Sequence, residues 1–268
     1  MAVIKASVCP YEFTEVLNRS TVKIFEVVKV SISKTNLALE DAALKFAKAN
    51  KKAIAKRRTD KAIYHPEENP VSVFMAGSPG AGKTEASIEL LDALGQSDSQ
   101  VIRIDPDELR SEFELYDGKN SYLFQKGVSV LVEKVHDLAL KQKQSFLLDG
   151  TLFNLSKART NIQRSLSKAR VVQILYVYQD PCLAWEFVQA REQAEGRRIL
   201  LEHFIAQYFA ALDNVNSIKR EFGKQVAVDL LLKDVNNGPR AYEANIDIID
   251  NHVSEKYTQE QLHKLLIN

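Results

Sequence analysis

The stretch that decides the fold is "SVFMAGSPGAGKTEAS", residues 72–87. It joins a short apolar run to a cluster of glycines that ends in Lys83 and Thr84, after which a helix begins. Residues Gly77–Thr84 match the pattern G-x-x-x-x-G-K-[ST] between a predicted strand and a predicted helix, the context that gives this pattern its meaning. Glycines let backbone N–H groups point inward, and the N-terminus of the helix adds partial positive charge. The segment therefore predicts a loop that binds the phosphates of a nucleoside triphosphate.

Two side chains of this phosphate loop have separate predicted tasks. We expect the ammonium group of Lys83 to reach the terminal phosphates, and the hydroxyl group of Thr84 to bind Mg²⁺. The residues expected to bind the nucleotide are Gly77, Ser78, Pro79, Gly80, Ala81, Gly82, Lys83 and Thr84. The pattern says nothing about the molecule that accepts the phosphoryl group.

The composition excludes several classes of protein. The chain has 268 residues, of which 45% are hydrophobic, and a net charge of +1, so no overall field attracts nucleic acid or an anionic membrane. It has no uncharged apolar run of about 18 residues that could span a membrane, and its N-terminus does not resemble a secretory signal. Cys9 and Cys182 lie far apart and have neither metal-binding nor redox spacing. We therefore expect a soluble cytoplasmic protein with reduced thiols.

Residues 1–65 differ from the rest of the chain, since they contain no glycine and no alternation of strands and turns. Apolar residues recur at helical spacing over residues 11–33 and 36–58, which predicts two helices. The segment "YHPEENP", residues 64–70, has two prolines and is typical of a linker. We therefore expect a small helical domain at residues 1–65 and a second domain at residues 66–268.

The stretch Lys48–Lys61 is dense in lysine and arginine. It could bind nucleic acid, but no aromatic residues interleave with the charges, and this favours a solvated helix face. We therefore expect no nucleic-acid partner.

From Val71 onward, short apolar strands alternate with helices. Strands are expected at residues 71–76, 100–105, 145–150, 171–179, 226–232 and 243–249, and helices at residues 84–94, 121–141 and 156–169. A closing helix is expected from Thr258, which forms a capping box with Gln261. The alternation predicts an α/β fold in which a doubly wound, mainly parallel sheet follows the small helical domain.

Two carboxylates follow the strand expected at residues 100–105. Pro106 keeps Asp105 out of helical geometry and suits the first position of a helix, so Asp105 is a natural N-cap, with Glu108 completing a pair like a capping box. This pattern is equally compatible with a functional role for Asp105. Asp107 has no capping task and stands in the first turn, where the helix N-terminus keeps a carboxylate ionised. We therefore expect Asp107 to accept a hydroxyl proton or to help bind Mg²⁺.

Two more acidic residues are candidates for the site. Asp149 ends an apolar run, the arrangement in which a carboxylate holds Mg²⁺ directly or through water; the alternative is a cap on the next turn. Glu133 lies in the middle of an expected helix, and periodicity alone favours solvent over the cleft for its side chain.

Arg191, Arg197 and Arg198 are candidates to neutralise the charge of a transferring phosphoryl group, and the alternative for them is a solvated basic helix. The five histidines show no ligand spacing, so we expect no metal site built from protein side chains alone.

In their order along the chain, these motifs resemble those of the zeta toxin family, P-loop kinases of bacterial toxin–antitoxin systems. The resemblance covers residues of about 70–200 and begins with the phosphate loop. Ile104–Asp107 matches the family's I-D-x-D, a long helix with an acidic residue follows, and Asp149–Thr151 matches the strand that ends in an acidic-Gly-Thr triplet. Two arginines come last. The resemblance implies a P-loop kinase fold.

The resemblance also implies roles for individual residues. It moves Glu133 from solvent into the substrate cleft, and it makes Asp107 the base that accepts the substrate's proton. For the second phosphate clamp it prefers Arg197 to Arg198 by spacing. The implied catalytic residues are Lys83, Asp107, Arg191 and Arg197; the implied substrate-binding residues are Asp107, Glu133 and Thr151; and the implied metal ligands are Thr84 and Asp149.

Zeta toxins use ATP and Mg²⁺ to phosphorylate the 3′-hydroxyl group of UDP-N-acetylglucosamine, which blocks the synthesis of cell-wall precursors. The resemblance implies the same cofactors and substrate here. These toxins are restrained by a separate small helical antitoxin that covers the ATP site. Because residues 1–65 are small, helical and fused, we expect them to act as an antitoxin in cis near Lys83. A stabilising helical cap on the kinase core is the alternative.

Two other functions fit the same loop. The first is a kinase of another small-molecule acceptor, which differs from a zeta toxin in its substrate alone. The second is a nucleotide switch or ATPase in which residues 1–65 bind a partner. A switch needs no proton-accepting carboxylate, so it predicts that an Asp107→Asn variant keeps its full biological effect.

Overall fold

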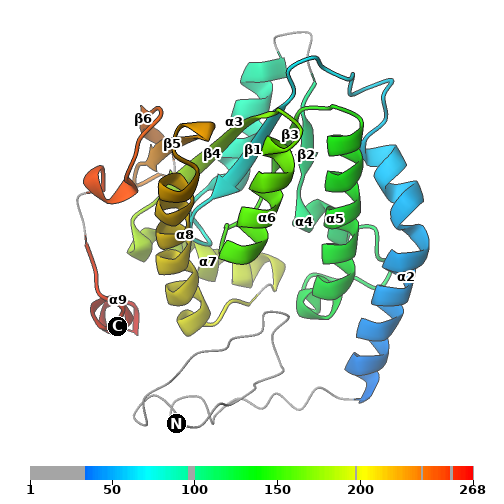
Figure 1. Cartoon of the computed structure of the whole chain (residues 1–268). Helices are drawn as coiled ribbons and strands as arrows, with labels where there is room; N and C mark the ends of the chain where they lie inside the picture. Colours follow the sequence, from blue (N-terminus) through cyan, green and yellow to red (C-terminus); the bar gives the residue numbers. More distant parts are fainter. Residues whose placement is uncertain (1–33, 96–99, 197, 237, 254–255, 268) are drawn as a thin grey trace, which may run out of the picture.

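A six-stranded sheet in the order β2-β3-β1-β4-β5-β6 forms the centre of the computed structural model (Figure 1). The strands are β1 (Val71–Ala76), β2 (Ile102–Ile104), β3 (Phe146–Leu148), β4 (Val171–Tyr178), β5 (Val226–Lys233) and β6 (Pro239–Glu243). The first five strands run parallel, and β6 pairs antiparallel with β5. The expected α/β fold with a mainly parallel sheet is confirmed.

The structure describes residues 34–95, 100–196, 198–236, 238–253 and 256–267. The helix expected at residues 11–33 therefore lies outside the described residues. Within them, the helix expected at residues 36–58 is confirmed as α2 (Lys34–Arg58).

Side chains of the central strands alternate between two apolar layers. In β1, Phe74 and Ala76 join a large buried cluster, whereas Val73 and Met75 join a smaller one on the opposite face. Because both faces of the sheet are covered, most residues of the central strands are apolar, with no regular alternation of apolar and polar positions.

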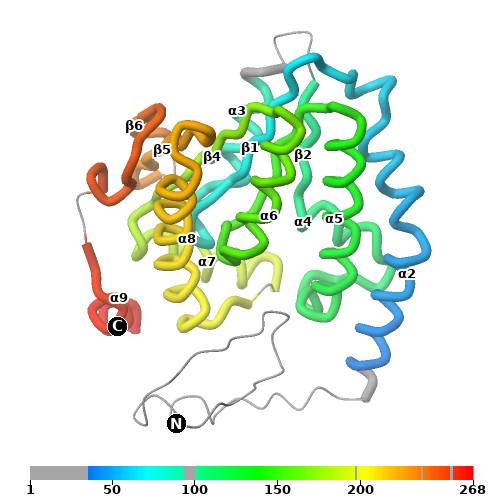
Figure 2. The backbone as a smooth tube through the Cα atoms, in the orientation of Figure 1, coloured from blue at the N-terminus to red at the C-terminus, as the bar shows by residue number. Residues whose placement is uncertain are grey.

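Helices cover both faces of the sheet (Figures 1 and 2). On the large cluster lie α5 (Gln125–Lys141), α6 (Leu155–Leu166) and α8 (Leu201–Phe222), and on the smaller one lies α3 (Lys83–Gly95). A third cluster joins α7 (Pro181–Glu195) and α9 (Gln259–Ile267) to α8. Shorter helical elements are α4 (Pro106–Arg110), η1 (Ser121–Phe124), η2 (Gly223–Gln225) and η3 (Ile249–Asn251).

The C-terminal part of the sheet differs from the prediction. The strand predicted at residues 243–249 is wrong, because β6 ends at Glu243 and a short 3₁₀ turn, η3, follows. Asn245 has a left-handed backbone with φ of 52°, and its N–H donates to the buried Asp229 carboxylate at 2.7 Å. The chain therefore turns at Asn245. The closing helix is confirmed with its cap, since Thr258 and Gln261 exchange hydrogen bonds of 2.8 and 3.1 Å.

The N-terminal helix α2 packs lengthwise against α5 (Figure 2). Ala43 and Ala47 are buried on α2, and Ile54 and Ala55 belong to the same apolar cluster as the sheet. A Cβ atom on Gly127 of α5 would lie 3.2 Å from the carbonyl oxygen of Ala43, so the two helices meet through small residues. The described part of the N-terminal region is thus packed into the core.

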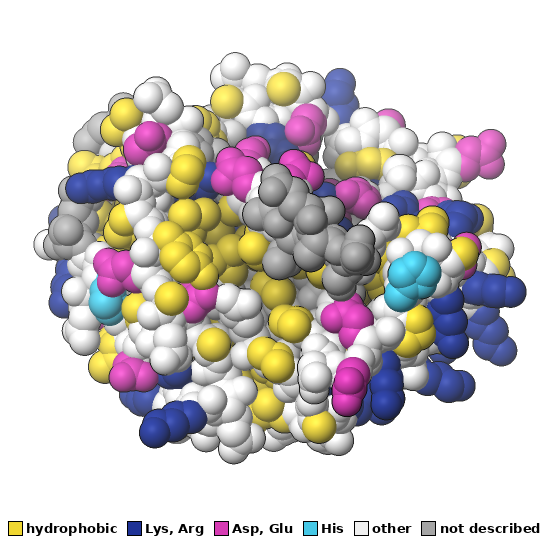
Figure 3. Space-filling view, turned by 90° about the horizontal axis from the view of Figure 1, so that it is seen from above, with side chains coloured by type: hydrophobic (Ala, Val, Ile, Leu, Met, Phe, Trp, Pro, Cys, Tyr) yellow, Lys and Arg dark blue, Asp and Glu magenta, His cyan; other side chains and the backbone are white. Residues whose placement is uncertain are grey.

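The outer side of α2 is basic. Figure 3 shows lysine and arginine side chains gathered at the edge of the molecule where α2 lies. Exposed lysines on this helix are Lys45, Lys48, Lys52 and Lys56. In the part of the chain that the structure describes, no helix is long and apolar enough to cross a membrane.

Candidate active site

The phosphate loop joins β1 to α3 at the edge of the sheet where the parallel strands end. Gly77, Gly80 and Gly82 have φ angles of 135°, 74° and 80°, a region that favours glycine. A Cβ atom on Gly77 would lie 2.3 Å from the carbonyl oxygen of Val177 on β4. A Cβ atom on Gly80 would lie 2.1 Å from the carbonyl oxygen of Ala184 on α7. The close approach of the loop to β4 and α7 therefore requires glycine at both positions.

Lys83 folds back over this loop. Its Nζ atom donates hydrogen bonds to the carbonyl oxygens of Gly77 at 3.1 Å and Ser78 at 2.6 Å. Anionic phosphate oxygens are stronger partners for an ammonium group than neutral carbonyls are. The ammonium group therefore lies at the loop that the sequence predicts to hold phosphates.

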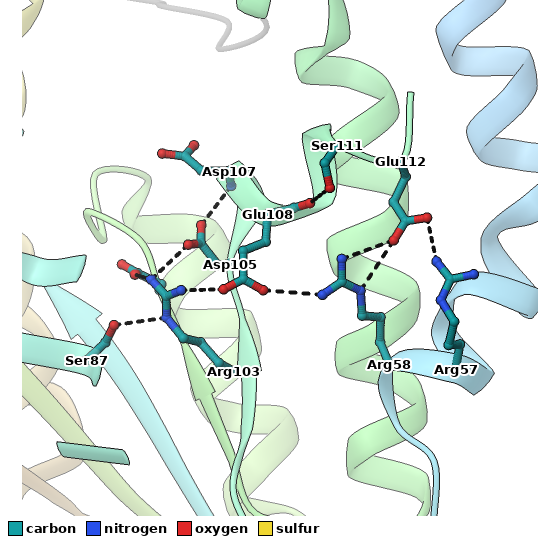
Figure 4. A network of polar contacts seen from close by, with 10 residues as sticks. Arg57, Arg58, Ser87, Arg103, Asp105, Asp107, Glu108, Ser111 and Glu112 are labelled. Carbon is teal, nitrogen blue, oxygen red and sulfur yellow. Dashed lines mark hydrogen bonds and ion pairs between the residues drawn. The ribbon is translucent and has the colours of Figure 1, made fainter. Parts of the chain in front are cut away.

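Asp105 caps α4, as the sequence predicts. Its backbone is extended, with φ of −108° and ψ of 119°, and its Oδ1 atom accepts the N–H of Asp107 at 2.7 Å, with Pro106 at the start of the helix. Burial raises the pKa of the Asp105 carboxyl group to about 6; the nearby Asp149 carboxylate adds to the rise, and the Arg103 guanidinium opposes it. Glu108 points away from the cap to arginines on β2 and α2 (Figure 4).

Arg103 of β2 is a site residue that our sequence reasoning missed. Its Nη2 atom lies 2.8 Å from Oδ2 of both Asp105 and Asp149. Its other nitrogens reach Glu108 at 2.5 Å and the Ser87 hydroxyl group of α3 at 2.9 Å (Figure 4). Burial alone would lower the pKa of the guanidinium, but the surrounding carboxylates raise it overall. A charged residue inside the apolar run "VIRID" was the signal that could have revealed it.

The Asp107 carboxylate lies between two arginines. Arg191 of α7 approaches its Oδ2 atom at 3.2 Å, so the structure brings together two of the predicted site residues. Arg110 of α4 pairs with the Oδ1 atom, is buried, and donates to the Gln125 side chain at 2.7 Å. Arg191 also donates to Glu195 at 2.8 Å. Sequence reasoning missed Arg110, which stands one helical turn after Asp107.

A strained loop follows Asp149 and carries Thr151. Leu152 has a left-handed backbone with φ of 53°, which is rare for a side chain of its size. The side-chain amide of Asn214 on α8 donates to the carbonyl oxygens of Leu152 at 2.9 Å and Phe153 at 2.7 Å. Asn214 therefore holds this loop in place beside the site, and sequence reasoning did not find it.

One predicted residue, Glu133, does not lie among these side chains. Glu133 of α5 is 46% exposed and pairs with Arg164 of α6 at 2.7 Å. It lies about 12 Å along α5 from Gln125, given the rise of an α-helix, so the structure does not place it beside Asp107. Arg197 lies outside the described residues, and the alternative, Arg198, is exposed and 3.7 Å from Glu192.

A sequence model of the family called "Zeta toxin" matches residues 54–247, which is more than half of the chain. The match includes the phosphate loop and the residues around Asp107, Asp149 and Arg191. A search of curated protein sequences gives no significant match.

Several solved structures share this fold. One comes from the PezAT chromosomal toxin–antitoxin system of Streptococcus pneumoniae, with a TM-score of 0.58 and 15% identity, and covers 85% of this chain and 93% of that chain. Two others are structures of the AvrRxo1-ORF1:AvrRxo1-ORF2 complex, one with sulphate ions and one with ATP. Each has a TM-score of 0.52 and 14% identity, and covers 80% of this chain and 70% of that chain. At these identities the likeness concerns the fold.

Proposed function

Because the chain belongs to the zeta toxin family, whose members are ATP-using kinases, we propose that it transfers the γ-phosphoryl group of ATP to the 3′-hydroxyl group of UDP-N-acetylglucosamine. The observation that carries this proposal is the position of the Asp107 carboxylate, between Arg110 and Arg191 at the edge where the phosphate loop lies. A nucleotide switch needs no such carboxylate. The acceptor itself follows from the resemblance of the I-D-x-D and Asp-Gly-Thr motifs to those of the family.

The proposed reaction is a single in-line transfer. Asp107 accepts the proton of the sugar hydroxyl group while the hydroxyl oxygen forms a bond to the γ-phosphorus. The bond from that phosphorus to the bridging oxygen of the β-phosphate breaks, and ADP leaves. Lys83 and Arg191 neutralise negative charge on the transferring group, and Arg197 is the proposed second arginine.

Thr84 and Asp149 are the proposed Mg²⁺ ligands. Hydroxyl and carboxylate oxygens suit this hard cation, whose other ligands are phosphate oxygens and water. Asp149 would hold the metal while its Oδ2 atom contacts Arg103. When bound, Mg²⁺ neutralises charge on the β- and γ-phosphates.

Asp107 and Thr151 are the proposed contacts to the amino sugar. Thr151 stands three residues after the end of β3 at the carboxyl edge of the sheet, and the hydrogen bonds from Asn214 hold the loop that carries it. Glu133 is paired with Arg164 on the outer side of α5, so the proposal gives it no contact with the sugar.

The proposal also covers toxicity and its control. The chain would act as a toxin in the cytoplasm by consuming a cell-wall precursor, as its family and the toxin–antitoxin origin of the PezAT structure suggest. We expected residues 1–65 to cover the nucleotide site, but α2 is packed against α5 and η1. We therefore propose that only residues 1–33 act as the internal inhibitor, and these lie outside the described residues.

The test combines the full chain with ATP, Mg²⁺ and UDP-N-acetylglucosamine, and it identifies the product by phosphorus NMR. We expect a 3′-phosphorylated sugar nucleotide, and we expect its formation to be faster after deletion of residues 1–33. If ATP binds but the sugar is unchanged, the acceptor is another small molecule. If Asp107→Asn keeps full toxicity in cells, the nucleotide switch replaces the kinase.

A further inference from the structure

We propose that Arg58, the last residue of α2, is a positioning residue for Asp107 and acts through α4. The inference rests on the proposed function, in which Asp107 is the base. In this proposal α2 supports catalysis and does not inhibit it, because the helix holds α4 and Asp107 in position.

Helix α4 cannot hold Asp107 in place by itself. It spans Pro106–Arg110, little more than one turn, and isolated helices shorter than about 12 residues are marginal in water. Its position therefore depends on contacts with other elements. On the inner side Leu109 is buried in the large apolar cluster, Arg110 donates a hydrogen bond to Gln125, and Asp105 caps the start of the helix.

Arg58 supplies contacts on the outer side (Figure 4). Its Nη1 atom lies 3.3 Å from Glu108, and its Nε and Nη2 atoms lie 3.4 and 3.1 Å from Glu112, the second residue after α4. Arg57 adds a contact of 2.5 Å to the other oxygen of Glu112. Burial alone would raise the pKa of the Glu112 carboxyl group, but the two arginines lower it overall, so this carboxylate is held in its charged form.

The end of α2 that carries Arg58 is itself fixed. The next residue, Thr59, is buried, and its carbonyl oxygen accepts hydrogen bonds from the side-chain amides of Gln142 at 3.0 Å and Gln144 at 3.1 Å. Further along α2, the Phe46 ring lies 5.3 Å from that of Phe113, which closes the turn after α4. Arg58 therefore extends from an anchored position, as a positioning residue must.

Glu108 connects Arg58 to the residues around Asp107. It binds Arg58 with one oxygen and Arg103 with the other, and Arg103 in turn binds Asp105, the cap of α4. Loss of Arg58 leaves Glu108 with Arg103 alone and Glu112 with Arg57 alone, so we expect α4 to be held less firmly. A small displacement of a catalytic group has a large effect on rate. Arg58 and Glu108 are partly exposed, at 31% and 43%, and ion pairs accessible to water contribute little to stability. The less exposed Glu112 keeps its contact with Arg57, so we expect this loss to affect turnover more than folding.

The experiment compares Arg58→Gln with Lys56→Gln in the full chain, by the rate of phosphoryl transfer from ATP to UDP-N-acetylglucosamine, or of ATP hydrolysis if that sugar is not the acceptor. Lys56 is exposed on the same helix, so it controls for the change in charge. We expect Arg58→Gln to lower kcat about fivefold, with KM for ATP unchanged. Glu112→Gln removes the charge that Arg58 and Arg57 contact on Glu112 but leaves Glu108 in place, so it should act in the same direction. Arg58→Lys should rescue in part, because lysine cannot hold both carboxylates at once.

The decisive readout is the same substitution in an Asp107→Asn background. If Arg58 acts through Asp107, Arg58→Gln lowers kcat no further once the base is gone. A further fivefold loss in that background, a kcat equal to that of Lys56→Gln, or a fall that follows the unfolding temperature alone would each overturn the proposal. An Asp107→Asn variant with full activity would instead overturn the proposed function, so the two failures are distinct.

Discussion

The two halves of the candidate site are built in different ways. The nucleotide half is one continuous loop, in which glycines at positions 77, 80 and 82 set the backbone and Lys83 closes it. The acceptor half joins side chains from α4, α7, β2 and the end of β3 around Asp107 and Asp105. The first half depends on backbone shape, and the second depends on balanced charge. Substitutions should therefore affect them in different ways.

The largest effect should come from Gly80→Ala. The new Cβ atom would lie 2.1 Å from the Ala184 carbonyl oxygen, at a φ of 74° that alanine rarely adopts. We expect the affinity for ATP to fall about a hundredfold or more, measured by calorimetry. Gly150→Ala is the control, since its Cβ atom would have no neighbour within 4 Å, and it should bind ATP normally. Normal binding by Gly80→Ala would show that the loop adapts to side chains.

Asp107→Asn should impair the acceptor half of the site and leave the nucleotide half intact. Asparagine keeps the shape of the side chain but cannot accept the hydroxyl proton, so kcat should fall by about a hundredfold or more while ATP binding stays unchanged. Glu114→Gln, at an exposed position nearby in sequence, should leave both quantities as they are. A parallel fall in ATP affinity would mean that the two halves are not separable.

The charge balance around Asp105 can be tested by the pH dependence of the free energy of unfolding. The pKa of its carboxyl group is raised from 3.8 to about 6 in the folded chain, so between these values the folded state binds more protons than the unfolded state. The Asp105 carboxyl group therefore adds about 3 kcal/mol to the free energy of unfolding below about pH 4, and this contribution is lost as the pH rises through about 6. Asp105→Asn, which keeps an N-cap, should remove this dependence. Denaturant unfolding of both chains at pH 4 and pH 7 measures the difference, and equal pH profiles would contradict the assignment.

The smallest effect should come from Asn214→Ala, which leaves the carbonyl groups of Leu152 and Phe153 without the amide of Asn214. We expect the free energy of unfolding to fall by about 1 kcal/mol, and the KM for the acceptor to rise because the loop with Thr151 loosens. Asn50→Ala removes the hydrogen bond from the Asn50 side-chain amide to the Phe46 carbonyl oxygen within α2, and it serves as the control for stability. An unchanged KM for the acceptor would separate this loop from acceptor binding.

The comparison also explains which parts of the site the sequence could predict. The phosphate loop and the Asp105 cap each depend on a few consecutive residues, so a pattern identifies them. Arg103 and Asp149 are 46 positions apart, and Arg191 and Asp107 are 84 positions apart. Such pairs meet only because parallel strands end at one edge, and no local pattern specifies which arginine faces which carboxylate.

The elements of the fold also differ in how well the sequence predicts them. Strands buried on both faces, such as β1 and β4, are plain in the sequence because all but one of their residues are apolar. The strand wrongly predicted at residues 243–249 alternates like an edge strand, but the distant Asp229 carboxylate draws the chain into a turn at Asn245. Glu133 is half-buried, is not among the buried residues of α5, and pairs with Arg164 of α6.

The short strand β2 has a consequence for motion. It has three residues and lies at the edge of the sheet beside β3, and α4 follows it after a single residue. Amide groups in such a strand open at lower free energy than those of long central strands. Native-state hydrogen exchange should therefore reach the segment that carries Asp107 before it reaches β1 and β4. In this protein the phosphate-binding half would still be folded when the acceptor half has already opened.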